Sequence, residues 1–308
     1  MIVAVCSDKG APGVTTLATV MAMVWPGGAT VLEADPSGGD LTFRLRSTQA
    51  PTQEFLLPEP SVFTLATDAR TGLMGQDIAR YGQVTTLGVR VVPGPLRAER
   101  TTNLRPLWPM LAHQLARSED MVIVDLGRVQ PGHAAWPLAQ AATVLLVLAR
   151  PDPEGLYHLR ERAAELAHDL GDISKARNPV GVVILAEIKQ HRTVMDQVEQ
   201  MFNAAGLPIP VAGWMADDRS AAAALREGEL TRTLRSSALL RSVSELATSV
   251  PRLWPHLLTP PASASEQPTP DGSDARRPIG RQQIPEPWSA RSSRASSPSQ
   301  SRRQEPLS

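Results

Sequence analysis

The residues best suited to chemistry in this 308-residue chain follow its first apolar run. The segment Ser7–Ala18 contains Gly10 and Gly13 and then the paired threonines Thr15 and Thr16. Glycine permits a positive φ and a close backbone approach, and the free N–H groups at the start of a helix attract anions. A threonine hydroxyl can also ligate Mg²⁺ beside bound phosphates. The segment therefore predicts a phosphate-binding turn between a strand and a helix.

Two acidic residues follow other apolar runs. Asp125 ends the run Met121–Val124, and Asp35 stands in Val31–Asp40. A buried carboxylate is costly without a cation or donors, so Asp125 is predicted to be a Mg²⁺ ligand. Asp35 has two interpretations, a functional carboxylate or part of an ordinary Asp-Pro-Ser-Gly turn.

A known family shares these features. The segment Lys9–Thr16 (Lys-Gly-Ala-Pro-Gly-Val-Thr-Thr) resembles the deviant Walker A loop of the ParA/MinD ATPases, whose pattern is K-G-G-x-G-K-T-T. Asp35 and Asp125 match the acidic-x-Asp-Pro and Walker B motifs of that family, and the similarity extends over about residues 1–250. The residues that this resemblance assigns to cofactor binding are Gly10, Ala11, Pro12, Gly13, Val14, Thr15 and Thr16.

The resemblance implies a mechanism. ATP would bind at the loop, with Mg²⁺ held by Thr15 and Asp125, and Asp35 would orient the attacking water. Lys9 matches the signature lysine, which acts on the nucleotide of the opposite protomer, so the catalytic residues would be Lys9 and Asp35. The implied state is a homodimer that forms with nucleotide, together with a protein partner or activator.

Two departures from the family pattern bear on activity. Val14 stands where the Walker lysine would neutralise the β- and γ-phosphates, and valine has neither charge nor donor. The segment Leu185–Glu187 lacks the asparagine that contacts the base in the family. Two functions stay open: an ATP-binding switch with weak or absent hydrolysis in partitioning or in positioning a cellular machine, and a catalytically degenerate scaffold that acts through protein partners.

The apolar runs predict the fold class. Seven short, Val-rich runs alternate with helical patterns, which is typical of a doubly wound α/β fold with a mostly parallel sheet, as in P-loop NTPases. The predicted strands are Ile2–Cys6, Thr30–Leu32, Val89–Val92, Met121–Leu126, Thr143–Leu148, Val180–Leu185 and Ile209–Trp214. Apolar spacing predicts one helix through Leu156 and Leu170 and a last helix capped by Ser236 or Ser237, while Pro51–Gln83 is interpreted as a loop with one or two helices.

Composition predicts the domain organisation. From residue 259 to 308 the chain has 9 Pro, 11 Ser and 7 Arg and few aliphatic side chains, so it cannot offset its ordering entropy and is predicted to be disordered. Residues 1–258 form the predicted folded domain. A single cysteine excludes a disulfide framework. The formal net charge of zero argues against a basic nucleic-acid-coating protein, and the apolar runs are too short to span a bilayer.

These features predict a cytoplasmic protein, with peripheral association to nucleoid or inner membrane only through partners. The histidines have no metal-ligand spacing, and no G-x-S-x-G motif is present, so a metallohydrolase and a serine esterase are excluded. Non-specific DNA contact is a further expectation, against the alternative of a solvated face. The residues concerned are Arg226, Arg232, Arg235 and Arg241.

Overall fold

The computed structural model describes residues 1–255 apart from 11, 49–54, 73–77, 131 and 171–178. The chain divides into a compact unit, Met1–Pro261, and a second unit, Ala262–Ser308. The predicted disordered tail from residue 259 lies outside the described residues. Within the described part, no helix has both the length and the apolar character needed to cross a membrane.

The compact unit is built on one eight-stranded sheet, in the order β3-β4-β2-β5-β1-β6-β7-β8. All neighbouring strands pair in parallel except β3, which joins the edge of the sheet antiparallel to β4. The strands are β1 (Ile2–Ser7), β2 (Thr30–Glu33), β3 (Gln83–Val84), β4 (Arg90–Val92), β5 (Val122–Arg128), β6 (Val144–Ala149), β7 (Val180–Ala186) and β8 (Val211–Ala216). The predicted α/β fold class is confirmed.

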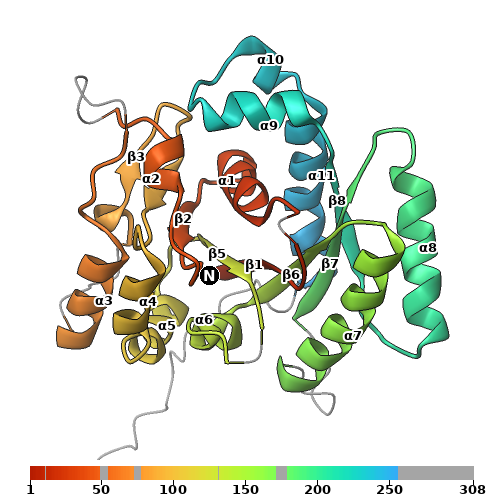
Figure 1. The fold of residues 1–308 in the computed structure, drawn as a ribbon, viewed down its shortest axis with the longest axis horizontal. Helices are drawn as coiled ribbons and strands as arrows, with labels where there is room; N and C mark the ends of the chain where they lie inside the picture. The colour runs from red at the N-terminus through yellow and green to blue at the C-terminus, as the bar shows by residue number, and fades with distance from the viewer. Residues whose placement is uncertain (11, 49–54, 73–77, 131, 171–178, 256–308) are drawn as a thin grey trace, which may run out of the picture. The chain divides into compact units, whose positions relative to one another are not determined.

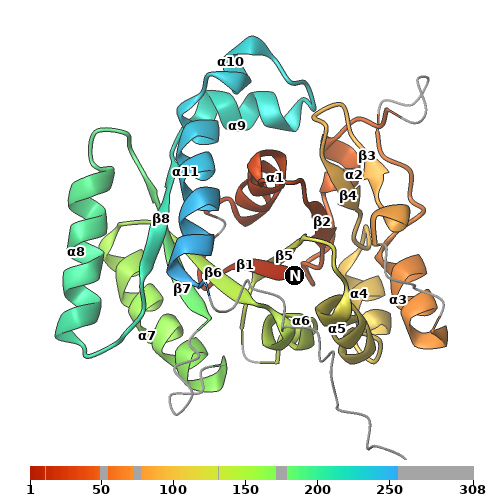
Figure 2. The same ribbon diagram turned by 180° about the vertical axis from the view of Figure 1, so that it is seen from behind.

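Helices cover both faces of the sheet (Figures 1 and 2). One face carries α1 (Val14–Val24), α2 (Leu41–Arg44), α9 (Arg219–Arg226), α10 (Arg232–Arg235) and α11 (Ala238–Leu253). The other carries α3 (Val62–Thr71), the 3₁₀ helix η1 (Ile78–Tyr81), α4 (Ala98–Leu104), α5 (Trp108–Arg117), α6 (Trp136–Ala141), α7 (Pro153–Leu170) and α8 (His191–Ala204). Strand β1 serves both layers, because Ile2, Ala4 and Cys6 face one apolar cluster and Val3 and Val5 face the other.

Most predicted elements are found near their expected places. The last strand is an exception, because it covers Val211–Ala216 rather than Ile209–Trp214. Pro210 has no N–H to give to a ladder, which explains why the strand starts after it. The two-residue strand β3 was not predicted. Ser237, not Ser236, caps α11, with its hydroxyl accepting from the Leu240 N–H at 3.1 Å.

The strand order determines where the predicted site residues meet. Strand β1 lies between β5 and β6, and β2 pairs with the far side of β5. In this register Asp125 is the partner of both Val5 and Glu33. The segments that follow β1, β2 and β5 therefore leave the sheet at the same edge, where ligands bind in doubly wound folds.

Candidate nucleotide site

The turn between β1 and α1 has the backbone geometry of an anion site. Gly10 and Gly13 adopt φ of 72° and 107°, which side-chain-bearing residues rarely adopt. Gly13 is the N-cap residue of α1, and this helix has neither a capping side chain nor an acidic residue in its first turn. The first N–H groups of α1 thus lack a side-chain acceptor, as the N-terminus of a helix that receives an anion requires.

Val14 turns away from this anion site. Its side chain is only 6% exposed and packs in the apolar cluster with Leu17 and Val20 beneath the helix. It is not among the residues that line the two cavities beside the loop described below. Ala11, the other departure within the loop, lies outside the described residues.

Asp125 is the most unusual ionisable group of the site. It is fully buried, and its Oδ1 accepts a hydrogen bond of 3.0 Å from the Gly127 N–H, whereas Oδ2 has no partner among the described residues. Burial raises the pKa of Asp125 to about 7. The Thr15 hydroxyl partly offsets this rise, although it forms no hydrogen bond that satisfies Oδ2. An orphaned, buried carboxylate oxygen next to a threonine is the state expected of a cation ligand without its cation.

Asp35 lies against the segment that follows Asp125. A Cβ added at Gly127 would lie 2.1 Å from Asp35 Oδ2, so only glycine lets the two segments approach this closely. Asp35 Oδ1 also accepts from the Ser37 N–H at 2.7 Å, as in the turn interpretation. The structure therefore brings Thr15, Asp35 and Asp125 to one place. The turn at Asp35 is present, and its functional role stays a prediction.

Glu33 is a buried carboxylate whose role sequence reasoning did not assign. It accepts backbone hydrogen bonds from Asp40 at 2.8 Å, Leu41 at 3.0 Å and Gly94 at 2.9 Å. Burial raises its pKa, and these three donors oppose the rise. Glu33 thus joins the end of β2 to the start of α2 and to the segment after β4. The only hint in the sequence is an acidic residue at the end of an apolar run.

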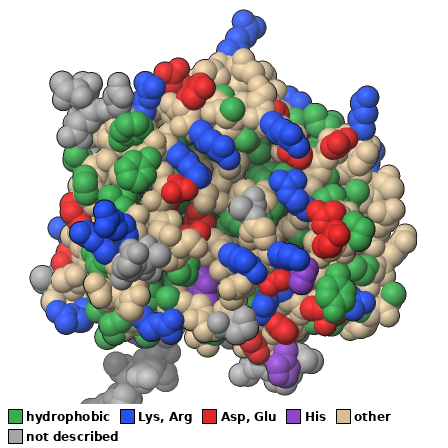
Figure 3. Space-filling model, viewed as in Figure 1, with side chains coloured by type: hydrophobic (Ala, Val, Ile, Leu, Met, Phe, Trp, Pro, Cys, Tyr) green, Lys and Arg blue, Asp and Glu red, His purple; other side chains and the backbone are tan. Residues whose placement is uncertain are grey.

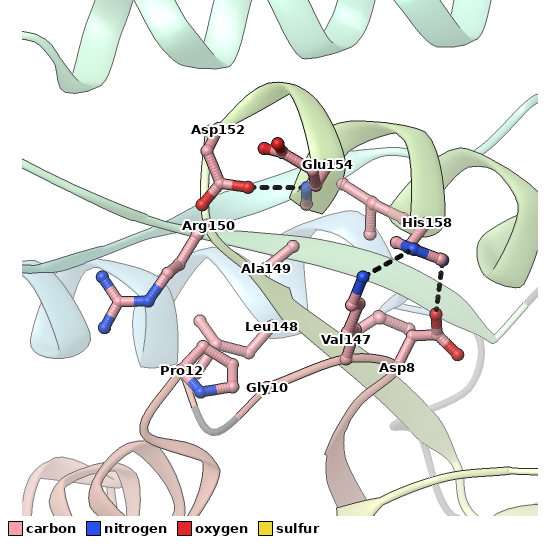
Figure 4. A pocket seen from close by; sticks show the side chains of 13 residues that line it. Asp8, Gly10, Pro12, Val147, Leu148, Ala149, Arg150, Asp152, Glu154 and His158 are labelled. Carbon is pink, nitrogen blue, oxygen red and sulfur yellow. Dashed lines mark hydrogen bonds and ion pairs between the residues drawn. The ribbon is translucent and has the colours of Figure 1, made fainter.

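Lys9 contacts α7 through His158, which Figure 4 shows beside Asp8. Its Nζ lies 3.2 Å from His158 Nε2, and His158 Nδ1 lies 3.5 Å from Asp8 Oδ2. Asp8 also accepts from Arg162 Nε at 2.8 Å, and Arg162 pairs with Glu165 at 2.6 Å. Within this chain the lysine is therefore held by a network of side chains from α7. Asp8 and Lys9 lie more than 140 positions from His158 and Arg162 in the chain, so no sequence pattern indicates these contacts.

Two cavities flank the loop. Lys9 borders the first, of about 180 Å³, together with the start of α7. The second, of about 220 Å³, lies on the other side, between the loop and the ends of β7 and β8. Its lining includes Gly13, Thr16, Leu185, Arg150 and Arg226. Leu185 contributes an apolar wall, and the segment Leu185–Glu187 has no asparagine of the kind that contacts the base in the ParA/MinD family.

Comparisons with known proteins rest on the fold. No protein-family model and no curated protein matches the sequence. Among solved structures, the cell division ATPase MinD of Pyrococcus furiosus has a TM-score of 0.59 at 16% identity, over 82% of this chain and 98% of that one. A ParA family ATPase from Chlorobium tepidum has a TM-score of 0.59 at 17% identity, over 80% and 97%.

A third structure is the septum site-determining protein MinD of Pyrococcus horikoshii in complex with Mg-ADP. It has a TM-score of 0.56 at 15% identity, over 82% of this chain and 96% of that one. All three cover nearly the whole of the compared chain. The chain therefore has the fold of the MinD and ParA ATPases, as the sequence resemblance predicted.

Proposed function

We propose that this chain binds ATP with Mg²⁺ at the loop 9–16 and acts as a nucleotide-dependent switch with weak or absent hydrolysis. The observation that carries the proposal is the fully buried Asp125, whose Oδ2 has no partner among the described residues. This carboxylate lies beside Thr15 and Asp35, next to a helix N-terminus without a capping side chain. The MinD of Pyrococcus horikoshii, which has the same fold, holds Mg-ADP.

The residues fit Mg²⁺ in one particular way. No cluster of three or more His, Cys, Asp or Glu that could hold a metal ion occurs among the described residues. Side chains of the described part would therefore not complete the coordination shell of the ion by themselves. Mg²⁺ in nucleotide sites commonly uses one or two protein oxygens, with the phosphates and waters completing its shell. The Thr15 hydroxyl and Asp125 Oδ2 would hold the ion. When bound, Mg²⁺ neutralises phosphate charge and restores the ionised form of a carboxylate that burial otherwise protonates.

The chain's own groups would divide the remaining tasks. The N–H groups of Gly13 and of the first turn of α1 would bind phosphate oxygens, and Thr16 would donate its hydroxyl to them. Asp35, held by the Ser37 N–H and by its contact with Gly127, would accept a hydrogen bond from the attacking water. Lys9 would leave His158 to reach the nucleotide of a second protomer, which makes the active state a homodimer.

We further propose a cellular role in positioning or partitioning, in the cytoplasm and with a protein partner. The support is the fold shared with a cell division ATPase, a septum site-determining protein and a ParA family ATPase. The predicted DNA contacts stay a prediction. Of the four arginines concerned, Arg241 donates to the Ser236 carbonyl, and Arg226 belongs to the candidate site itself.

A thermal-shift experiment tests nucleotide binding. ATP with Mg²⁺ is expected to raise the Tm of the wild type, because only the folded state binds. The shift is expected to disappear in Asp125→Ala and to persist in Asp196→Ala, which removes an exposed carboxylate on α8. A wild type that shows no shift with any nucleotide at millimolar concentration would contradict the proposal.

The second candidate function is a scaffold that keeps the fold without nucleotide. One observation favours it: Val14 is packed in the core, so the loop lacks the cation that the family uses for the phosphates. The scaffold predicts no nucleotide effect on Tm, and the thermal-shift experiment therefore separates the two functions.

A further inference from the structure

The loop has no cation at position 14, and Lys9 contacts His158 on α7, so the site depends on positive charge from elsewhere. Figure 3 shows Lys and Arg side chains, with Asp and Glu among them, over the region in which Figure 1 places α1 and α9. Four arginines line the two cavities that border Thr16. Arg150, Arg219 and Arg226 border the cavity of about 220 Å³, and Arg226 and Arg44 border a small cavity with Thr15 and Thr16. Arg226 is the arginine common to both cavities.

We infer that Arg226 supplies the phosphate-binding charge that Val14 cannot. The inference rests on the proposed function and adds a residue to it. Arg226 ends α9, far in sequence from the loop, and reaches the threonine pair from the side opposite Lys9. A guanidinium offers a fork of N–H donors that matches two phosphate oxygens, whereas lysine acts as a point charge.

The end of α9 is fixed in place, which gives Arg226 a defined position. Leu225 is 4% exposed and packs in the apolar cluster of α1. Two residues after Arg226, a Cβ added at Gly228 would lie 3.2 Å from the Arg44 carbonyl oxygen. The Thr86 hydroxyl donates to the Gly228 carbonyl. These contacts fix the backbone on both sides of Arg226 against the segment that leaves α2.

The guanidinium of Arg226 is available for a ligand. It is exposed and has no hydrogen-bond or ion-pair partner among the described residues. Of the other cations near it, Arg44 pairs with Asp40 and Arg150 lies 3.7 Å from Asp217. Arg219 has no hydrogen-bond or ion-pair partner among the described residues, but it lines the cavity of about 220 Å³ and not the small one.

The carboxylates that line the two cavities are engaged as well. Asp217 faces Arg150, and Asp218 caps α9 by accepting from the Ala221 N–H at 3.0 Å. A phosphate entering the site would therefore meet two guanidinium groups without a partner, those of Arg226 and Arg219, and no carboxylate without a partner among the described lining residues. This balance of charge favours an anionic ligand.

The experiment measures binding of two probes, Mg-ATP and tripolyphosphate with Mg²⁺, to the full chain by calorimetric titration. Arg226→Ala is expected to weaken both by about 10- to 100-fold, which corresponds to loss of one charge-assisted hydrogen-bonded contact. Arg226→Lys is expected to recover part of the loss because it keeps the charge. The control Arg235→Ala removes an exposed arginine of α10 that does not line these cavities, and it is expected to bind like the wild type.

Tripolyphosphate has no base or sugar, so its binding reports recognition of the phosphates alone. If the wild type binds and Arg226→Ala binds equally well, Arg226 does not contact phosphate and the inference is overturned while nucleotide binding stands. If the wild type binds tripolyphosphate but not ATP, and Arg226→Ala loses it, the inference holds and the proposed ATP switch fails. If the wild type binds neither probe, both are overturned. A lower Tm of unliganded Arg226→Ala would assign the arginine a structural role and overturn the inference as well.

Discussion

At the scale of single residues, the candidate site has two unusual features: the buried carboxylate Asp125, and a valine where the family has a lysine. Asp125 lies in a fully buried position with an unsatisfied oxygen, and Val14 occupies the position of a phosphate-binding lysine but packs in the core. These two features have opposite implications for nucleotide binding. Each can be tested by one substitution.

Asp125 is expected to make the unliganded protein less stable as the pH rises. Its folded-state pKa of about 7 exceeds that of an unfolded aspartate, about 3.9, so the native state retains a proton that the unfolded chain has lost. Stability contributed by this group is present at and below about pH 4 and is lost as the pH rises to about 7, after which it is level. Asp125→Asn is expected to be more stable than the wild type at pH 8 by at least about 1.4 kcal/mol, relative to their difference at pH 4. Chemical denaturation at the two pH values measures this; equal pH dependence in both proteins would refute it.

Val14→Lys is expected to tighten Mg-ATP binding. The new side chain starts in the apolar cluster, but its flexible stem can carry the ammonium toward the N-terminus of α1, where anions are favoured. Val14→Met is the matched control, because it adds similar length without charge and shares the cost of overpacking, about 1–3 kcal/mol. Calorimetric titration is expected to show at least about tenfold tighter binding for the lysine variant than for the methionine variant. Equal affinities would show that the first turn of α1 does not face the phosphates.

At the scale of elements, α7 holds Lys9. The Lys9 ammonium donates to Nε2 of His158, and Nδ1 of the same ring lies 3.5 Å from Asp8 Oδ2. This contact keeps Lys9 within its own chain, whereas the proposed dimer requires it in the other one. In that dimer, α7 would compete with the nucleotide of a second protomer for the same ammonium group.

Removal of the contact between Lys9 and His158 is expected to favour the ATP-dependent dimer. His158→Ala is expected to form more dimer with ATP and Mg²⁺ than the wild type, by at most about fivefold in the association constant, because an exposed contact contributes about 1 kcal/mol or less. Sedimentation velocity measures the effect. His168→Ala, at an exposed position of the same helix, is expected to behave like the wild type, and Lys9→Ala is expected to abolish the ATP-dependent dimer. If neither His158→Ala nor Lys9→Ala changes the dimer fraction, Lys9 does not act on the nucleotide of the other protomer.

Apolar runs predict the elements well because parallel strands covered on both faces have a continuous apolar pattern. The loop after β1, Thr15 and Asp125 could be predicted because their residue types and spacing carry chemistry. The contact of Lys9 with His158, the backbone hydrogen bonds that Glu33 accepts and the place of Arg226 could not be predicted. They depend on side chains that only the strand order brings together, and a histidine or arginine on a helix has no pattern that identifies its partner.

At the scale of the whole molecule, the compact unit Met1–Pro261 and the C-terminal segment after it are predicted to be separable by proteolysis. The structure places the boundary of the compact unit at Pro261, close to the change in composition near residue 259. Limited proteolysis is expected to trim the chain to a stable core that ends between about Val250 and Pro260, because a Pro/Ser/Arg-rich segment lacks protective packing. Mass spectrometry of the fragments identifies the end. A resistant fragment that extends beyond Gly272 would contradict this domain boundary.

A loop with valine in place of the Walker lysine is proposed to bind nucleotide. Equilibrium dialysis of the full chain against labelled ATP, with and without Mg²⁺, measures this binding. Saturable binding of one ATP per chain is expected, weakened when Mg²⁺ is removed and when Asp125 is replaced by alanine. No saturable binding at millimolar ATP with Mg²⁺ present would contradict it and leave the fold as a scaffold.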